Sequence, residues 1–244
     1  GLVQSAMTNF SKGQKHVKIF EFGNIFVSGE RGEREEKMVA SAFISGVQEN
    51  NVWEQTGKSY DYYDLKGTLS AVSRLLKLKL IEHPEPENPF MLKGRSVGLT
   101  VDGKACGYLG ELSPSIIRQY ELPKHCIVFE LDFDRLMCTL PKQVRFLNLP
   151  KFPEIYRDIS ILIDKTVPSG EVIDRINQVG GPLLRKVELY DHFEGNKIKE
   201  GEKSLTYALT FQSSDRTLID EEVNLVFEKI VKILSSQLGA MLRE

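Results

Sequence analysis

A strand gives way to a helix in the run Phe211-Gln-Ser-Ser-Asp-Arg-Thr-Leu-Ile-Asp-Glu-Glu-Val-Asn224. Residues 204–212 alternate polar and apolar side chains, which is the two-residue period of a β-strand. Residues 220–238 carry apolar side chains at helical spacing, and three acids stand where they complement the dipole of a helix N-terminus. The run therefore predicts a strand followed by a helix that covers one side of a sheet.

Residues 151–244 predict one complete module around this run. Its expected elements are a strand at 155–163, a helix at 169–179, strands at 186–193 and 204–212, a helix at 220–238 and a strand at 239–243. This βαββαβ order is that of ferredoxin-like folds.

A separate domain is expected before this module. Residues 140–153 contain three prolines, and since proline lacks an N–H and disfavours helix at the residue before it, they predict an extended connector. We place the domain boundary near Lys151, which gives domains at 1–150 and 151–244.

The first domain reads as an antiparallel sheet with helices on it, an α+β pattern. Strands are expected at 17–26, 38–47, 96–101, 104–109 and 127–133, with a turn at 28–36. Apolar residues at helical spacing predict a helix at 64–78. Ser113 and Pro114 predict the cap and first residue of a short helix.

The composition is that of a globular protein, with 41% hydrophobic and 27% charged residues, and no apolar run is long enough to span a membrane. The formal net charge is -2, and residues 151–244 hold 13 basic and 16 acidic residues. Any nucleic-acid contact must therefore use a local surface.

The three cysteines have neither zinc-site nor disulfide-framework spacing, so we expect cytosolic thiols and no metal. The chain has no visible signal peptide and no initiator Met, which suggests a cytoplasmic fragment of a longer polypeptide.

One face of the predicted ferredoxin-like sheet is lined by small residues. In the strand at 204–212, Ser204, Thr206 and Ala208 alternate with leucines and aromatics, and Ser160 falls on the same side in the first strand. This face could be an ordinary solvated surface, or one that RNA approaches closely. An RNA recognition motif is disfavoured, because Tyr207 and Phe211 share the leucine side and would be core rather than exposed stacking rings.

Phe193 is the aromatic residue expected at the edge of this small-residue face. A base from a single-stranded loop can stack on such a ring, although a lone Phe can equally be a hydrophobic plug. The neighbouring His192 has no nucleophile or acid at a telling spacing, so no catalytic role is predicted.

Several motifs carry a resemblance to a known family. The segments Lys151-Phe-Pro-Glu-Ile-Tyr-Arg-Asp-Ile-Ser160, Gly181-Pro-Leu-Leu-Arg-Lys-Val-Glu-Leu-Tyr-Asp191, Glu200-Gly-Glu-Lys-Ser-Leu205 and Ser214 to Asn224 resemble the ferredoxin-fold anticodon-binding domain that ends the bacterial phenylalanyl-tRNA synthetase beta chain. Upstream, Lys18-Ile-Phe-Glu-Phe-Gly-Asn-Ile-Phe26, Tyr63-Asp-Leu-Lys-Gly67, Lys93-Gly-Arg-Ser96 and Gly107-Tyr-Leu-Gly-Glu-Leu-Ser-Pro114 are similar to the class II synthetase-like domain of the same chain.

The resemblance implies an α+β protein with a class II synthetase-like antiparallel sheet domain followed by a ferredoxin-like domain. It implies binding of the anticodon of phenylalanine tRNA, and packing against a catalytic alpha subunit in a heterotetramer of two alpha and two beta chains. The whole enzyme would use ATP and magnesium to attach phenylalanine to tRNA. Residues 18–26 and 107–114 lack the arginines that a triphosphate would need, so this chain alone is expected to have no catalytic residues and no cofactor.

The family's anticodon-contacting positions map onto Ser160, Phe193 and Ser204. We expect Phe193 to stack on a base, and the two serines to contact its polar edges or sugar. Arg157, Lys203 and Arg216 are candidates for phosphate contacts. Arg157 and Arg216 could instead form structural ion pairs, with Asp158 or Asp215 as neighbours.

Two departures from the family pattern affect helix starts. Ile219 stands where the family usually has a capping Thr, which removes a side-chain cap worth about 1 kcal/mol. Ser113 stands where the family commonly has His.

Two other interpretations of the chain's function stay open. One is a ferredoxin-like regulatory module for a small molecule, and the other is a scaffold unrelated to aminoacylation.

Overall fold

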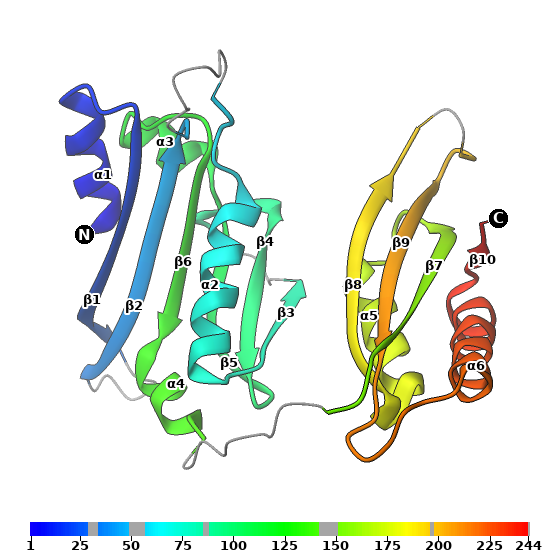
Figure 1. Cartoon of the computed structure of the whole chain (residues 1–244). Coiled ribbons are helices and arrows are strands. Elements are labelled where there is room, and N and C mark those ends of the chain that lie inside the picture. Colours follow the sequence, from blue (N-terminus) through cyan, green and yellow to red (C-terminus); the bar gives the residue numbers. More distant parts are fainter. Residues whose placement is uncertain (29–33, 49–56, 85–87, 142–150, 196–197, 244) are drawn as a thin grey trace. The chain divides into compact units, whose positions relative to one another are not determined.

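The chain divides into two compact units in a computed structural model, Gly1–Arg145 and Phe146–Glu244 (Figure 1). The structure describes residues 1–28, 34–48, 57–84, 88–141, 151–195 and 198–243. Most of the predicted connector, residues 142–150, lies outside these residues. In the described part, no helix is long and apolar enough to cross a membrane.

The first unit is a six-stranded antiparallel sheet of order β1-β2-β6-β5-β4-β3. Its strands are β1 His16–Ser28, β2 Arg34–Gly46, β3 Leu80–Pro84, β4 Met91–Val101, β5 Lys104–Leu112 and β6 Cys126–Asp132. Its helices are α1 Leu2–Ser11, α2 Tyr62–Leu76, α3 Pro114–Gln119 and α4 Phe133–Thr139.

Alternation along the strands gives this sheet two apolar faces. Ala40, Ala42 and Ile44 of β2 join the core beneath α2 and α4, while Phe43 points to the other side and packs with Ala6 of α1. Both faces of the sheet are therefore buried over part of their area.

Several expected boundaries in the first unit are corrected by the structure. The predicted turn at 28–36 is shorter, because β1 runs to Ser28 and β2 starts at Arg34. β6 ends at Asp132, because its carboxylate accepts a hydrogen bond from Arg135 N (2.9 Å) and starts α4. Ser113 occupies the N-cap position of α3, but its hydroxyl bonds the Ser115 hydroxyl (2.8 Å) and caps no backbone N–H. β3 and α4 were not predicted.

The second unit has the predicted βαββαβ order. Its elements are β7 Ile155–Asp164, α5 Ser169–Gly180, the short 3₁₀ helix η1 Gly181–Leu183, β8 Leu184–Phe193, β9 Glu202–Phe211, α6 Asp220–Leu238 and β10 Met241–Leu242. The antiparallel sheet order is β10-β7-β9-β8, as in a ferredoxin-like fold. β10 is shorter than the predicted strand at 239–243, because Gly239 ends α6 with a left-handed φ of 65°.

The core of the second unit lies between the sheet and its two helices. The fully buried side chains Tyr207, Leu209 and Phe211 of β9 face Val172 of α5 and Ile230 of α6. Both helices therefore cover the same face of the sheet (Figure 1). Among the described residues of the second unit, no helix lies on the opposite face, which carries the candidate site.

Candidate nucleic-acid interface

The face of the second sheet that the helices leave uncovered is called the open face here. Register places its residues in rows across the strands, because directly opposed residues point to the same side. It comprises Tyr156, Asp158, Ser160 and Leu162 of β7, Ser204, Thr206, Ala208 and Thr210 of β9, Lys186, Glu188, Tyr190, Asp191 and Phe193 of β8, and Met241 with Arg243 at the C-terminal strand.

A β-bulge in β8 brings Phe193 onto the open face. Leu189 opposes the core residue Tyr207, but the register then shifts so that Asp191 opposes Thr206 and Phe193 opposes Ser204. Without the extra residue, strict alternation from Leu189 would turn Phe193 toward the helices. The bulge therefore creates the pairing of Phe193 with Ser204.

Phe193 is 39% exposed at the end of its strand. Gly195 lies against the ring, since a Cβ at that position would stand 3.1 Å from the Phe193 Cζ. Beside it, Lys165 Nζ pairs with Glu194 (3.1 Å) and, with His192, lowers the pKa of the Glu194 carboxyl. The ring is thus accessible, with both charge signs nearby.

Ser204 is less accessible than the sequence predicted. Its residue is 1% exposed, and its hydroxyl accepts a hydrogen bond from Arg243 Nη1 (3.1 Å). Arg243 N also donates to Ser160 O (2.9 Å), so β10 holds this arginine over the sheet. The Ser160 and Thr206 hydroxyls form a hydrogen bond to each other (3.0 Å). Arg243 is the exposed group at this point, and sequence analysis missed it.

Two exposed tyrosines on the open face were also missed. Tyr156 is 63% exposed and Tyr190 is 59% exposed. Partial desolvation, and after it the nearby Asp158 carboxylate, raise the pKa of Tyr190. Alternation from Ser160 would have found Tyr156 and Asp158, whereas Tyr190 depends on the bulge.

The three predicted phosphate-binding residues do not join this group. Arg157 alternates to the helix side, where it pairs with Asp220 and donates to Asn224 (3.2 Å). Arg216 donates two bonds of 2.6 Å to Glu222, which raises the pKa of Arg216. Lys203 donates to a backbone carbonyl, Lys165 O (3.1 Å).

Arg157 and Arg216 thus form structural ion pairs, the alternative to a phosphate contact that the sequence had left open. The salt-bridge partners are not Asp158 and Asp215 but Asp220 and Glu222, which both lie in the first turn of α6. Asp215 is nevertheless a charge neighbour of Arg216, as expected, because it also raises the pKa of Arg216.

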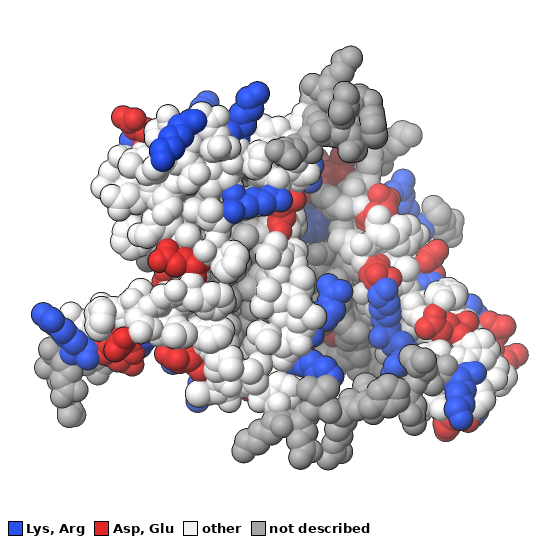
Figure 2. Space-filling view, turned by 60° about the vertical axis from the view of Figure 1, so that its left-hand side comes forward, with Lys and Arg blue, Asp and Glu red and all other residues white. Residues whose placement is uncertain are grey.

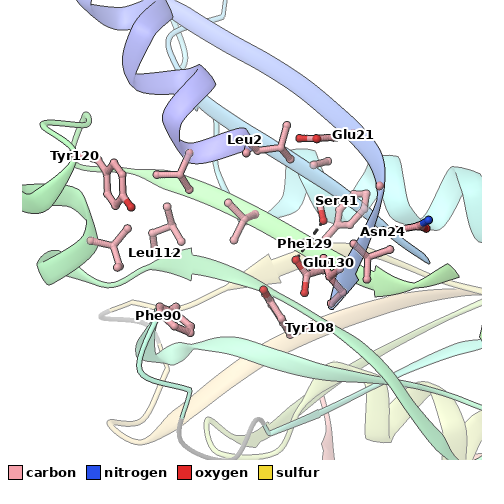
Figure 3. A pocket seen from close by; sticks show the side chains of 18 residues that line it. Leu2, Glu21, Asn24, Ser41, Phe90, Tyr108, Leu112, Tyr120, Phe129 and Glu130 are labelled. Atoms are coloured by element: carbon pink, nitrogen blue, oxygen red, sulfur yellow. Dashed lines mark hydrogen bonds between the residues drawn. The ribbon is translucent and has the colours of Figure 1, made fainter. Parts of the chain in front are cut away.

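The first unit contains a cavity of about 490 Å³ between α1, α3 and the sheet (Figure 3). Its lining includes four aromatic residues, Phe90, Tyr108, Tyr120 and Phe129, and two carboxylates, Glu21 and Glu130. Ser41 donates to Glu130 (3.3 Å), drawn as a dashed line in Figure 3. Among the described residues that line this cavity there is no Lys, Arg or His side chain.

A triphosphate requires positive charge around it, so this cavity does not fit ATP. The described residues also contain no group of three or more His, Cys, Asp or Glu that could hold a metal ion.

Comparison with protein families shows to which family this chain belongs. Residues 1–133 match the model described as the phenylalanyl tRNA synthetase beta chain CLM domain. The chain belongs to the phenylalanyl-tRNA synthetase beta chain family. Residues 150–243 match the ferredoxin-fold anticodon binding domain. The resemblance seen in the sequence motifs is confirmed, as is the α+β fold with a ferredoxin-fold module.

Relatives in the beta chain family cover the whole of this chain. Phenylalanine–tRNA ligase beta subunits of Vibrio cholerae and Moorella thermoacetica are each 34% identical over 100% of this chain, which corresponds to 31% and 30% of their own lengths. The beta subunit of Geobacillus kaustophilus is 31% identical over 99% of this chain and 30% of its length. The chain therefore spans less than a third of the relatives it matches. The regulatory and scaffold readings are not favoured by these matches.

Proposed function

We propose that this chain is the C-terminal part of a phenylalanine–tRNA ligase beta subunit, and that its open face holds the anticodon loop of phenylalanine tRNA. The observation that carries the proposal is the exposed Phe193, turned by the β8 bulge onto the open face of a domain that a family model describes as anticodon-binding. Single-stranded RNA loops are recognised by stacking of splayed bases on such rings.

Each residue of the open face has a separate part in this proposal. Phe193 stacks on one anticodon base, and the Ser160 hydroxyl contacts a polar edge or sugar. Arg243 meets a phosphate or a base edge in front of Ser204, whose own hydroxyl it occupies. Arg157 and Arg216 stabilise the start of α6, because their guanidinium groups are engaged by carboxylates on the helix side.

The first unit, in this proposal, packs against the catalytic alpha subunit. Phe20, Phe22 and Phe26 stand 75%, 55% and 70% exposed on one side of the edge strand β1. An edge strand with exposed aromatic side chains is suited to covering by another protein. Figure 2, which brings the β1 side of Figure 1 forward, shows broad stretches without Lys, Arg, Asp or Glu.

The complete ligase would be a heterotetramer of two alpha and two beta chains in the cytoplasm. It would use ATP and magnesium to attach phenylalanine to tRNA. We assign adenylate chemistry to the alpha subunit and expect this chain alone to be inactive. The cavity between α1, α3 and the sheet supports this assignment, because its described lining has no positively charged side chain for a triphosphate.

The test is binding of phenylalanine tRNA to the chain together with its alpha subunit, in a band-shift assay. Phe193→Ala removes a stacking ring worth about 1 to 3 kcal/mol, so Kd should rise roughly 5- to 150-fold. His192→Ala is the matched control, because His192 opposes the core residue Leu205 and pairs with Glu194. An unchanged Kd in Phe193→Ala, or wild-type binding that ignores the anticodon sequence, contradicts the proposal.

A further inference from the structure

We infer that Tyr190 is a second base-stacking residue of the anticodon interface. This inference rests on the proposed function, and it adds a second nucleotide position to the single ring at Phe193.

The position of the Tyr190 ring follows from the register of β8 and from its neighbour on β7. Tyr190 is the extra residue of the β8 bulge, and Asp158 of β7 lies near enough to its hydroxyl to raise the pKa of Tyr190. β9 runs between these two strands, so the ring lies across β9 at the row of Thr206 and Ala208. Both side chains beneath it are small, and Thr206 is only 8% exposed. The ring therefore lies along the sheet rather than standing away from it.

The outer side of this ring is free to receive a ligand. Tyr190 is 59% exposed. An exposed aromatic ring on the open face offers a surface on which a base can stack.

The spacing of the two rings suits neighbouring bases that have been pulled apart. Phe193 opposes Ser204, and the bulge that holds Tyr190 opposes Thr206, two residues along β9. Two residues of a strand span roughly 7 Å, which is wider than the roughly 3.4 Å between stacked bases of one strand. The bases must therefore unstack from one another, as they do in single-stranded RNA loops.

The charge beside Tyr190 favours a base over a phosphate. Asp158 places a carboxylate on the open face, and Arg243 lies on the other side of Ser160, at the β10 edge. Phosphate is repelled at Asp158 and attracted at Arg243, which directs the RNA backbone toward β10 and the bases toward β8.

The experiment measures Kd for phenylalanine tRNA with the chain and its alpha subunit, using Tyr190→Ala and a set of tRNAs with an abasic nucleotide at each anticodon position in turn. Tyr190→Ala should weaken binding of intact tRNA about tenfold, within the range for loss of one stacked base. For the tRNA that lacks the base stacked on Tyr190, the same substitution should have no further effect. A merely structural role would weaken binding to every tRNA in the set equally.

Three variants separate the ring from its hydroxyl and from the neighbouring charge. Tyr190→Phe keeps the ring and should lose no more than about twofold to threefold. Asp158→Ala and Asp158→Asn remove the carboxylate that repels phosphate, and both should bind at least as tightly as the wild type. Tyr63→Ala, which removes a 72% exposed tyrosine of α2, is the control and should leave Kd unchanged.

The outcomes distinguish this inference from the proposed function. If Phe193→Ala weakens anticodon-dependent binding and Tyr190→Ala does not, Tyr190 is no stacking residue and the inference is overturned while the proposed function stands. The inference is also overturned if Tyr190→Ala weakens binding equally for all abasic tRNAs. If wild-type binding is independent of the anticodon, the proposed function itself fails.

Discussion

The start of α6 lacks a side-chain cap, and supplying one should stabilise the second unit. Ile219 holds the N-cap position with extended backbone angles, φ -105° and ψ 154°, and has no side-chain acceptor. Glu222 already accepts from Ile219 N (3.3 Å), which is half of a capping box. Ile219→Ser adds the missing half, a hydroxyl that accepts from the backbone N–H of Glu222.

The magnitude follows from replacing an uncapped start by a capped one. A Ser cap is worth about 1 kcal/mol over Ala at the same position. For a unit of this size, about 1 kcal/mol corresponds to a rise in Tm of about 4–8 °C. The exposed position of Ile219, 56%, means that little packing is lost when its side chain is shortened.

The assay compares Ile219→Ser with Ile219→Ala, since both remove the isoleucine and only one supplies a cap. Urea and thermal unfolding followed by far-UV circular dichroism report both units. Equal stability of the Ser and Ala variants would refute the capping argument.

Three further outcomes are expected. Arg157→Ala should lower the free energy of unfolding by about 0.2–1 kcal/mol and leave the Kd for tRNA unchanged, because its guanidinium pairs with α6 on the helix side; a weaker Kd with normal stability would restore the phosphate role. Glu222→Gln should destabilise the chain at neutral pH, because the Arg216 guanidinium lowers the pKa of the Glu222 carboxyl in the folded state. That contribution is present above the ordinary Glu pKa of about 4.3 and is lost as pH falls through the lowered value, so a difference in urea stability that persists at about pH 2 contradicts it. Phe20→Ser with Phe26→Ser should reduce co-purification with the alpha subunit without changing thermal unfolding, and undiminished co-purification would place the subunit interface elsewhere.

Much of the second unit could be predicted because the patterns that mark its strands and helices involve residues close together in the sequence. The run from Phe211 to Asn224 marks the end of β9 and the start of α6, and both occur where the periodicity changes. Its side chains are mainly structural in the folded chain. Phe211 is fully buried, Leu218 is 4% exposed, and Arg216 pairs with Glu222.

The first unit was harder to predict because its short elements have little periodicity. β3 has five residues and α4 has seven, too few for a repeating pattern to stand out. Leu75 fits the helical spacing of α2 but is 82% exposed, because apolar spacing does not show which part of a helix finds a partner.

The sequence by itself determined the family, the βαββαβ order and the side of β9 that faces the helices, because motifs, turn residues and alternation are properties of neighbouring positions. Only the tertiary structure decided the composition of the open face. The bulge at Tyr190 shifts the register of β8 by one residue and so sets the side on which Phe193 lies. The pairing of β10 with β7 brings Arg243 to Ser204, 39 positions away in sequence. Such contacts depend on strand register and on which strands are neighbours, and neither is encoded in the period of a single strand.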